Sequence, residues 1–519
     1  MKRRSSYDVA AFRLLILSIV FDPILNNLKT RVYSYGWNSV RDQYEHYPYP
    51  PPSEDEISRW EKTNEPIDLP PVLQSPSHLI EMNHYLWQGR RDYCTKPFRI
   101  LVAGGGTGVK TLQLARQLKD MRARDVEIVH LDVSQKSLDI ARRRAISIGL
   151  GDRIQFVRGA IEDAKADALG GRFHYIDCLG VLHHMLDPVL GLKSLAALLT
   201  DDGGMSLMFY GKLGRTGLYP VQELLRMMRV SNDAEGIDFV RRFVSNGLPS
   251  SNLLRSDDWF FNEFNTSLHT SKPAQIVDVL MPFRDVAYRI DQVFRMIQRA
   301  DLRVVELLQP AIYRPESYIT DSETLARVPS GKIERALFAE LLAGNIGHHF
   351  LYVSKKTPAV TVGTATLNNV RQSRHAIPVP HFFDGPSLAS ALDRWPIETL
   401  PWRHRNLRFA MPLPKMAPKI LRLIDGRSTL LDIFRNVTNR PSASCEENEV
   451  KEFRAFLEGP FRVLFETLNG INKLYLTYAP NAPVQFRGNP GRHGGAPMNG
   501  YHFPRPCGAD DGGGVGVDK

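Results

Sequence analysis

A glycine-rich turn between a short apolar strand and a helix constrains the fold of this chain more than any other feature. The apolar run at residues 99–103 leads directly into Gly104-Gly-Gly-Thr-Gly108, and the pattern that follows predicts a helix. In open α/β sheets, ligands bind where such a turn leaves backbone uncovered at the end of a strand. Gly104, Gly106 and Gly108 fit the spacing G-x-G-x-G, whereas the dinucleotide fingerprint G-x-G-x-x-G needs a glycine where Val109 stands. The turn therefore predicts a ligand site.

Strand-like and helix-like runs alternate along the middle of the chain. This pattern indicates βαβ crossovers and a mostly parallel sheet covered by helices on both faces, which is a doubly wound α/β fold. The alternation stops after Gly211 and resumes near Val286, and the mostly helical stretch between them, about 212–285, predicts a cap insertion. The predicted strands are 99–103, 126–132, 153–157, 173–178, 205–210, 303–308 and 349–353; the predicted helices are 107–118, 134–149, 188–199, 286–300 and 333–342, with a turn at 201–204.

The flanking segments differ from this α/β part in composition. Residues 1–96 predict an N-terminal helical and proline-rich segment, and the α/β domain is expected over 97–356. Residues 357–380 have no periodicity and predict a linker. Residues 381–480 predict a small, mainly helical C-terminal domain, and the glycine- and proline-rich tail 481–519 predicts disorder.

Asp132 ends the second predicted strand, 24 residues after Gly108. In nucleotide-binding folds of this type, an acid at about 20 residues' offset accepts hydrogen bonds from ribose hydroxyls, because both carboxylate oxygens are acceptors. The alternative is that Asp132 is a turn or cap residue before Ser134.

In their order, these motifs resemble the class I S-adenosylmethionine-dependent methyltransferases. The resemblance covers about 97–211 and extends more loosely to 356. It implies a Rossmann-like sheet of seven strands, the last of them antiparallel, with S-adenosylmethionine as the cofactor. The matching pieces are Ile100 to Gly108, Leu131-Asp132, Phe156 to Gly159, Val181 to His184, Asp187-Pro188 and Asp201 to Gly204.

The resemblance also implies which residues bind the cofactor. They are Gly104, Gly105, Gly106 and Gly108 beneath the methionine part, Asp132 at the ribose, Val133, Ala160 and Ile161 at the adenine, and Cys178 and Leu179 around the methionine. Many members carry an acid for the adenine amino group where this chain has Ala160. Glu162 and Asp163 are the candidates for that task here.

Methyl transfer needs a base only if the acceptor must lose a proton, and His183 and His184, after the fourth strand, are the catalytic candidates. The alternative is that this pair packs or caps a helix. Tyr210 and Arg215 are candidates for acceptor contacts, with a plain strand end and surface position as the alternative.

Two further segments carry weaker resemblances. Residues 43–49 look like the Tyr-Glu-x-x-Pro-Tyr-Pro segment that precedes some bacterial methyltransferase domains, so they predict either a lid over the cleft or a proline-rich linker. Residues 414–433 resemble winged-helix-like peptide-chaperone domains, which implies binding of a peptide or partner; a helical packing module is the alternative.

Composition limits the remaining possibilities. A formal net charge of +10 permits anionic partners without demanding them. The apolar run at residues 9–21 is shorter than the roughly 18–20 residues that span a bilayer. We therefore predict a cytoplasmic protein without stable membrane insertion. The four cysteines, Cys94, Cys178, Cys445 and Cys507, are far apart, and no metal site is expected.

The sequence thus predicts an enzyme that transfers a methyl group from S-adenosylmethionine to an unidentified acceptor, with a small molecule or a protein favoured over nucleic acid. The alternative is a cofactor-binding scaffold with an inactive methyltransferase-like domain. An NAD or nucleotide-sugar enzyme is disfavoured by Val109.

Overall fold

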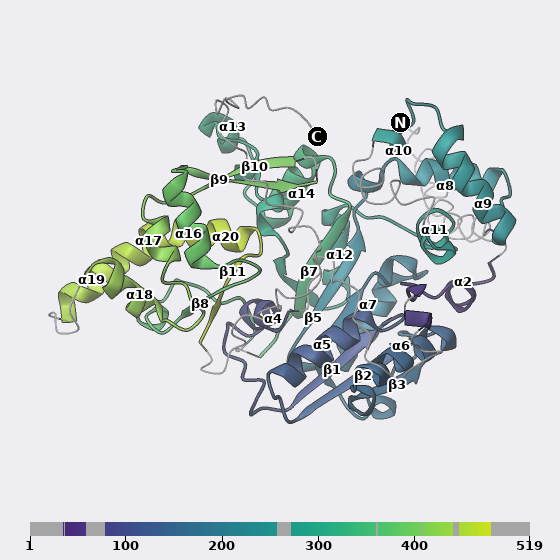
Figure 1. Cartoon of the computed structure of the whole chain (residues 1–519), viewed down its shortest axis with the longest axis horizontal. Coiled ribbons are helices and arrows are strands. Elements are labelled where there is room, and N and C mark those ends of the chain that lie inside the picture. Colours follow the sequence, from purple (N-terminus) through teal and green to yellow (C-terminus); the bar gives the residue numbers. More distant parts are fainter. Residues whose placement is uncertain are drawn as a thin grey trace, which may run out of the picture.

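A seven-stranded sheet forms the centre of the computed structural model (Figure 1). Its strand order is β3-β2-β1-β4-β5-β7-β6, and only β7 runs antiparallel to its neighbours. The predicted seven-stranded, mostly parallel fold is confirmed. The strands are β1 Phe98–Ala103, β2 Val126–Asp132, β3 Ile154–Arg158, β4 Phe173–Leu179, β5 Leu199–Tyr210, β6 Leu302–Leu307 and β7 His348–Lys355.

The structure describes residues 35, 37–54, 56–58, 78–256, 271–359, 362–405, 407–439 and 446–478. The apolar run at 9–21 and the tail 481–519 lie outside these residues. Within the described part of the chain, no helix combines the length and the apolar character needed to cross a bilayer.

Alternating residues along β1 determine how the sheet is covered. Ile100 and Val102 face α4 (Leu79–Leu86) and α5 (Val109–Asp120), whereas Leu101 faces α7 (Pro188–Leu198) and α12 (Ile290–Arg299). Because both faces of a parallel strand are buried, its sequence is continuously apolar. Helix α6 (Gln135–Ser147) begins after Ser134, whose hydroxyl accepts from the amide of Ser137 as predicted for an N-cap. Helix α14 (Lys332–Ala343) precedes β7.

The cap and the N-terminal segment share a second apolar core. The cap contains α8 (Leu218–Met227), α9 (Ala234–Arg242), α10 (Leu253–Ser256) and α11 (Pro273–Leu280). We call the described residues 37–54 and 56–58 the N-terminal segment; it includes α2 (Val40–His46). Trp37 packs into the cap core, and its indole N–H donates to the carbonyl of Met281 at 3.1 Å.

The C-terminal unit, described over residues 381–478, lies on the opposite side of the sheet from the cap (Figure 1). Its apolar core is continuous with that of the sheet and of α12. The winged-helix-like resemblance of this unit stays a prediction. Its elements are α16 Gly385–Arg394, the antiparallel pair β9 Thr399–His404 and β10 Leu407–Pro412, α17 Ala417–Leu421, α18 Leu430–Val437, α19 Glu446–Phe456, α20 Arg462–Gly470 and β11 Leu474–Thr477.

Two local predictions differ from the structure. The stretch 357–380, expected as a linker, contains α15 (Val370–Ser373) and β8 (Ile377–Pro380), and β8 pairs antiparallel with β11. The turn expected at 201–204 lies inside β5, which begins at Leu199. Glycine is required there because a Cβ on Gly204 would lie 2.5 Å from the side chain of Leu86 on α4.

Four histidines predict a loss of stability in mild acid: His84 and His130 are buried, and His78 and His404 are half-buried. Burial lowers the pKa of His84 to about 3 and the pKa of the other three to about 4. Below about pH 6.5 these histidines bind protons in the unfolded chain, whereas in the folded chain they stay neutral down to about pH 4. The free energy of unfolding therefore falls as the pH is lowered from about 6.5 to about 4. Each histidine contributes a slope of up to about 1.4 kcal/mol per pH unit. Urea unfolding at pH 7.5, 6.0 and 5.0 measures this, and an unchanged midpoint would show that these histidines titrate normally.

Candidate active site

A cavity of about 1330 Å³ lies at the edge of the sheet where the parallel strands end. Its floor is formed by the ends of β1, β2, β4, β5 and β6 and by the first residues of β7. Its walls come from the N-terminal segment, the cap and the C-terminal unit. We call it the main cavity. Its position is the one at which open α/β sheets bind ligands.

The glycine-rich turn lines the main cavity through Gly104, Gly105 and Gly106. A Cβ on Gly104 would lie 2.5 Å from Val181, and one on Gly105 would lie 2.3 Å from the His130 ring. Gly106 has φ +52°, and its Cβ would lie 2.6 Å from the carbonyl oxygen of Tyr49. A side chain at any of these positions would therefore displace a neighbouring wall, so the turn forms a cradle of bare backbone.

Gly108 has a different task. It is the N-cap of α5 with φ +90°, and a Cβ there would lie 2.8 Å from Ala141 on α6. This glycine lets α5 and α6 approach each other, and it is not among the described residues that line the main cavity.

Asp132 lies at the rim of this cradle and is 7% exposed. Its Oδ2 accepts from the amide of Gly106 at 2.8 Å, and its Oδ1 accepts from the amide of Ser134 at 2.9 Å. Burial raises the pKa of this carboxyl, and the backbone hydrogen bonds oppose that rise. Because each carboxylate oxygen has two acceptor positions, Asp132 can shape the turn and still accept from a ligand.

His130 supports the cradle from below. Its Nε2 lies 3.1 Å from the carbonyl oxygen of Gly106, and its Nδ1 lies 2.7 Å from the hydroxyl of Thr111. A carbonyl can only accept, so Nε2–H donates to Gly106 and the neutral ring accepts from Thr111. The neutral form fits the low pKa that burial gives this histidine.

The N-terminal segment lies against the cradle. The carbonyl of Tyr49 accepts from the amide of Thr107 at 3.3 Å, and the carbonyl of Pro50 accepts from the hydroxyl of Thr107 at 2.6 Å. The Glu45 carboxylate accepts from the amide of Gln135, at the start of α6, at 2.9 Å. Of the two alternatives for this segment, a lid and a plain linker, these contacts favour the lid.

A buried ion pair fixes the end of this segment. The guanidinium of Arg144 donates to Glu56 at 2.8 and 3.1 Å and to the carbonyl of Thr107 at 2.9 Å. Arg144 has no exposed surface, and Glu56 is 4% exposed. Since breaking a buried pair leaves an uncompensated charge, this contact holds the segment on the glycine-rich turn.

His184, Tyr44 and Asp278 meet inside the main cavity. The Tyr44 hydroxyl lies 3.2 Å from His184 Nε2 and donates to Asp278 Oδ1 at 2.8 Å. His184 Nδ1 lies 2.6 Å from the carbonyl oxygen of Arg284 and must donate to it. Tyr44 comes from the N-terminal segment, His184 from the turn after β4 and Asp278 from α11 of the cap.

The protein comparisons agree with this geometry. A family model described as "Methyltransferase domain" matches residues 101–205, which include the glycine-rich turn, Asp132 and His184. The chain carries a class I S-adenosylmethionine-dependent methyltransferase domain.

The chain has distant relatives among known proteins. It is 28% identical over 323 residues to "Uncharacterized protein syc1184_c" of a Synechococcus species, which covers 61% of this chain and 71% of that one. It is 32% identical over 116 residues to the tRNA 5-carboxymethoxyuridine methyltransferase of Escherichia coli, covering 22% of this chain and 41% of that protein. The chain thus spans less than half of that enzyme's length.

Among solved structures, PKMT2 from Rickettsia typhi in complex with AdoHcy has a similar fold. The TM-score is 0.50 at 15% sequence identity, and the match covers 77% of this chain and 73% of that one. The similarity therefore extends beyond the methyltransferase domain.

The structure places the predicted site residues of the methyltransferase domain in two groups. Gly108, Asp163, Cys178 and His183 are not among the described residues that line the main cavity, and the last two are completely buried. His183 stacks on the Tyr210 ring at 3.8 Å, and burial holds its pKa well below the ordinary value. The cavity-lining group consists of Gly104, Gly105, Gly106, Asp132, Val133, Ala160, Ile161, Leu179 and His184, and also includes Glu162, Tyr210 and Arg215.

Arg215 is buried, so the alternative prediction of a surface position for this residue is wrong. Its guanidinium lies over the Tyr210 ring at 3.6 Å and pairs with Asp285 at 3.0 Å. It thereby fixes the wall of the main cavity beside His184.

Sequence reasoning missed several cavity residues. Lys110 follows the glycine-rich turn by two positions and lines the main cavity, so its position in the motif was an available signal. Asp278, His348 and Arg405 reach the cavity only through tertiary packing. No local pattern in the sequence marks them.

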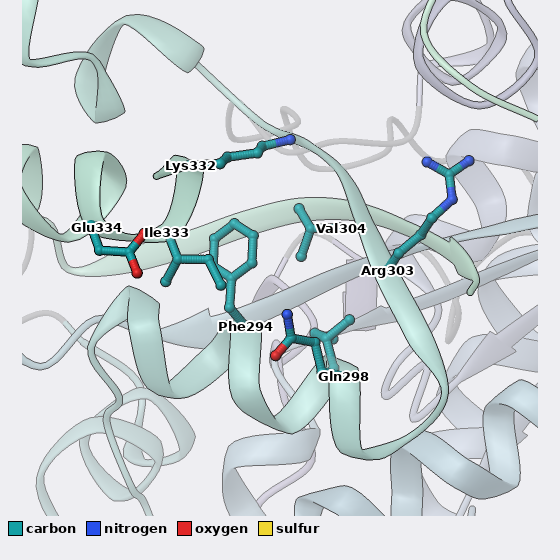
Figure 2. Close-up of a pocket in the computed structure, with 8 residues that line it drawn as sticks. Phe294, Gln298, Arg303, Val304, Lys332, Ile333 and Glu334 are labelled. Carbon is teal, nitrogen blue, oxygen red and sulfur yellow. The ribbon is translucent and has the colours of Figure 1, made fainter. Parts of the chain in front are cut away.

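A second groove of about 380 Å³ lies between α12, β6 and α14, away from the main cavity (Figure 2). Phe294, Val304 and Ile333 lie at its centre, with Arg303 and Lys332 beside them. It shares no lining residue with the main cavity. Among the described residues, no group of three or more histidine, cysteine or acidic side chains is arranged to hold a metal ion.

Proposed function

We propose that the chain transfers the methyl group of S-adenosylmethionine to an acceptor bound in the main cavity, with His184 as the proton-accepting group. The observation that carries this proposal is the meeting of a bare-backbone cradle, Asp132 and the His184–Tyr44–Asp278 cluster in one cavity. A cofactor alone does not need such a cluster.

The cradle fits the cofactor. The backbone of Gly104, Gly105 and Gly106 would lie beneath its methionine part, Asp132 would accept from the ribose hydroxyls, and Val133, Ala160 and Ile161 would contact the adenine. Leu179 would lie beside the sulfonium. Lys110, also in the cavity lining, is the cation for the methionine carboxylate. When bound, S-adenosylmethionine supplies a methyl group already activated by its sulfonium.

The chain's own part in the reaction is positioning, exclusion of water and acceptance of a proton. His184 donates its Nδ1–H to Arg284, so in the neutral ring the Nε2 lone pair faces the Tyr44 hydroxyl. The acceptor's proton reaches Nε2 through this hydroxyl, whose oxygen takes the acceptor's proton as its own proton passes to Nε2. The imidazolium then donates from Nε2 to the Tyr44 oxygen, while the Tyr44 hydroxyl donates to Asp278. A carboxylate at the end of this chain of bonds stabilises the positive charge.

The names of the relatives do not identify the methyl acceptor of this chain. Proteins similar to this domain are named for a tRNA uridine and for an O-methylation in ubiquinone biosynthesis, so the domain itself serves different acceptors. Which acceptor binds is determined by the side chains on the walls of the main cavity, which come from the N-terminal segment, the cap and the C-terminal unit.

We expect His184→Ala to lower methyl transfer without loss of cofactor binding. General-base catalysis contributes about 10²- to 10⁴-fold, so kcat should fall by this factor. The assay incubates the full chain with S-adenosylmethionine labelled at the methyl group and with protein, RNA and small-molecule fractions of a cell extract. Affinity for S-adenosylhomocysteine, measured by calorimetry, should stay within about twofold, because His184 contacts the acceptor side.

Tyr44→Phe is the companion variant, and His375→Gln, at an exposed position, is the matched control. Loss of the Tyr44 hydroxyl should lower kcat and shift its pH profile, because the His184 cation loses its link to Asp278. Unchanged kcat in His184→Ala would rule out the assigned base. Binding of S-adenosylhomocysteine with no methyl transfer to any fraction would favour the scaffold alternative.

A further inference from the structure

The wall that the C-terminal unit contributes to the main cavity is positively charged. The described residues of this unit that line the cavity include Arg403, His404, Arg405, His381 and Lys473 but no aspartate or glutamate. The acidic side chains of the cavity come from the methyltransferase domain, from α4 and from the cap. The C-terminal unit thus adds only positive charge to its side of the main cavity.

Three acidic residues of the cavity accept hydrogen bonds from groups of the protein. Asp132 accepts from backbone amides, and Asp278 accepts from Tyr44. Glu81 accepts from the hydroxyls of Tyr352 and Tyr475 at 2.6 and 2.7 Å. Their charges therefore serve the cradle, the base cluster and the packing of α4.

Arg405 is held in place by contacts with the methyltransferase domain. Its Nη1 donates to the carbonyl of Asn345 at 2.9 Å, and its Nη2 lies 3.4 Å from His348 Nδ1. A Cβ on Gly347 would lie 2.4 Å from the Arg405 guanidinium, so glycine is needed for this approach. A guanidinium fixed in this way presents a rigid fork of donors, which suits carboxylate and phosphate oxygens.

Aromatic rings connect Arg405 to the base cluster. The His348 ring lies 5.5 Å from the Tyr210 ring, which in turn lies 6.2 Å from the His184 ring. Arg405, His348, Tyr210 and His184 therefore follow one another along the edge of the sheet, and all four line the main cavity.

Two histidines beside this guanidinium have lowered pKa values, and burial is the main cause. Burial, and then the Arg405 guanidinium, lower the pKa of His404 to about 4 and hold the pKa of His348 well below its ordinary value. A facing carboxylate would raise both.

From this arrangement we propose that the C-terminal unit recognises an anionic group of the methyl acceptor, a carboxylate or a phosphate, through Arg405 and Arg403. The acceptor is therefore an acid whose anionic group lies on the Arg405 wall while the atom to be methylated lies at His184. The inference rests on the proposed methyl transfer, because it names the acceptor class for the same cavity.

Calorimetric titration of small probes tests the proposal without turnover. The full chain is first saturated with S-adenosylhomocysteine and then titrated with benzoate, benzamide, benzylamine and phenyl phosphate. Benzoate and benzamide have the same shape and differ in charge. Hydrogen bonds to charged groups are the stronger ones, so we expect benzoate to bind at least about tenfold more tightly than benzamide. If benzoate binds more tightly than phenyl phosphate, the site recognises a carboxylate; if phenyl phosphate binds more tightly, it recognises a phosphate.

Arg405→Gln should bring benzoate down to the affinity of benzamide, and Arg405→Lys, which keeps the charge but loses the fork, should keep part of the preference. Arg327→Gln, at the exposed C-cap of α13 (Ser322–Ala326), is the matched control. If Arg405→Gln does not fold, Arg403→Glu, at an exposed position, tests the same wall.

Equal binding of benzoate and benzamide, binding of neither, or tighter binding of benzylamine by the wild-type chain would overturn the proposal. A full preference for benzoate in Arg405→Gln would overturn it as well. Failure of the first step, binding of S-adenosylhomocysteine, would instead count against the proposed function itself.

Discussion

A chain that ends at Thr357 is expected to lose the folded methyltransferase domain and all cofactor binding. The C-terminal unit covers α4 and residues 310–313 through α20 and β11, and the retained side chains of Tyr85, Ala311 and Ile312 are each at most 3% exposed in the full chain. Exposing such side chains costs about 1.5–3 kcal/mol each, against a total stability of about 5–15 kcal/mol.

Polar contacts add to this dependence. Glu81 is 3% exposed and loses the Tyr475 hydroxyl, while His84 loses the amide of Leu476, which donates to its Nδ1 at 3.0 Å. Each buried polar group left without its partner costs about 1–3 kcal/mol. Circular dichroism melting and calorimetry with S-adenosylhomocysteine measure the outcome.

The control for this truncation is a chain that ends at Tyr478 and so keeps every described residue. It should melt as the full chain does. A cooperative melt together with wild-type cofactor affinity in the chain ending at Thr357 would show that the two parts are independent, as the linker predicted at 357–380 implies.

Asp132→Asn should lower both cofactor affinity and stability. The variant keeps the shape of the side chain but loses the charge, and hydrogen bonds to charged groups are worth roughly 1.5–3 kcal/mol, so affinity should fall about 10- to 150-fold. One carboxylate oxygen becomes an NH₂ group that faces a backbone amide of Gly106 or Ser134. Two donors cannot bond, so stability should fall by about 1–3 kcal/mol.

Asp139→Asn is the matched control, because this acid lies on α6 with 52% of its side chain exposed. Neither quantity should change in it. The two backbone amides that Asp132 accepts from also fit the alternative in which it is a turn residue before Ser134. Wild-type affinity in Asp132→Asn would remove the ribose assignment even if stability fell.

The parts of the fold that the sequence predicts correctly are those whose signals are local. β2 ends at Asp132 and Ser134 caps α6 because apolar runs and capping side chains act within a few residues. β8 has no such signal, since its four residues are stabilised by pairing with β11, far along the chain. The strand character of Gly204 is equally nonlocal, because it comes from pairing with Tyr175 of β4 and Ser354 of β7.

The same distinction applies to the site. The glycine-rich turn, Asp132 and His184 lie in one motif-bearing stretch, and the structure gathers them in one cavity. Asp278 is one acid on a cap helix, and Arg405 sits in a hairpin turn. Nothing in their neighbours indicates that they line the cavity beside His184. Folding brings them there, and so the acceptor side of the site could not be predicted from motifs.

Calorimetric titration of S-adenosylmethionine into the full chain, with NAD as the competing candidate, tests the central claim most directly. The cradle, Asp132 and Lys110 predict saturable binding of S-adenosylmethionine at a single class of sites and no binding of NAD, since Val109 interrupts the dinucleotide spacing. NAD binding in place of S-adenosylmethionine, or no binding of either, would contradict the assignment of the main cavity to methyl transfer.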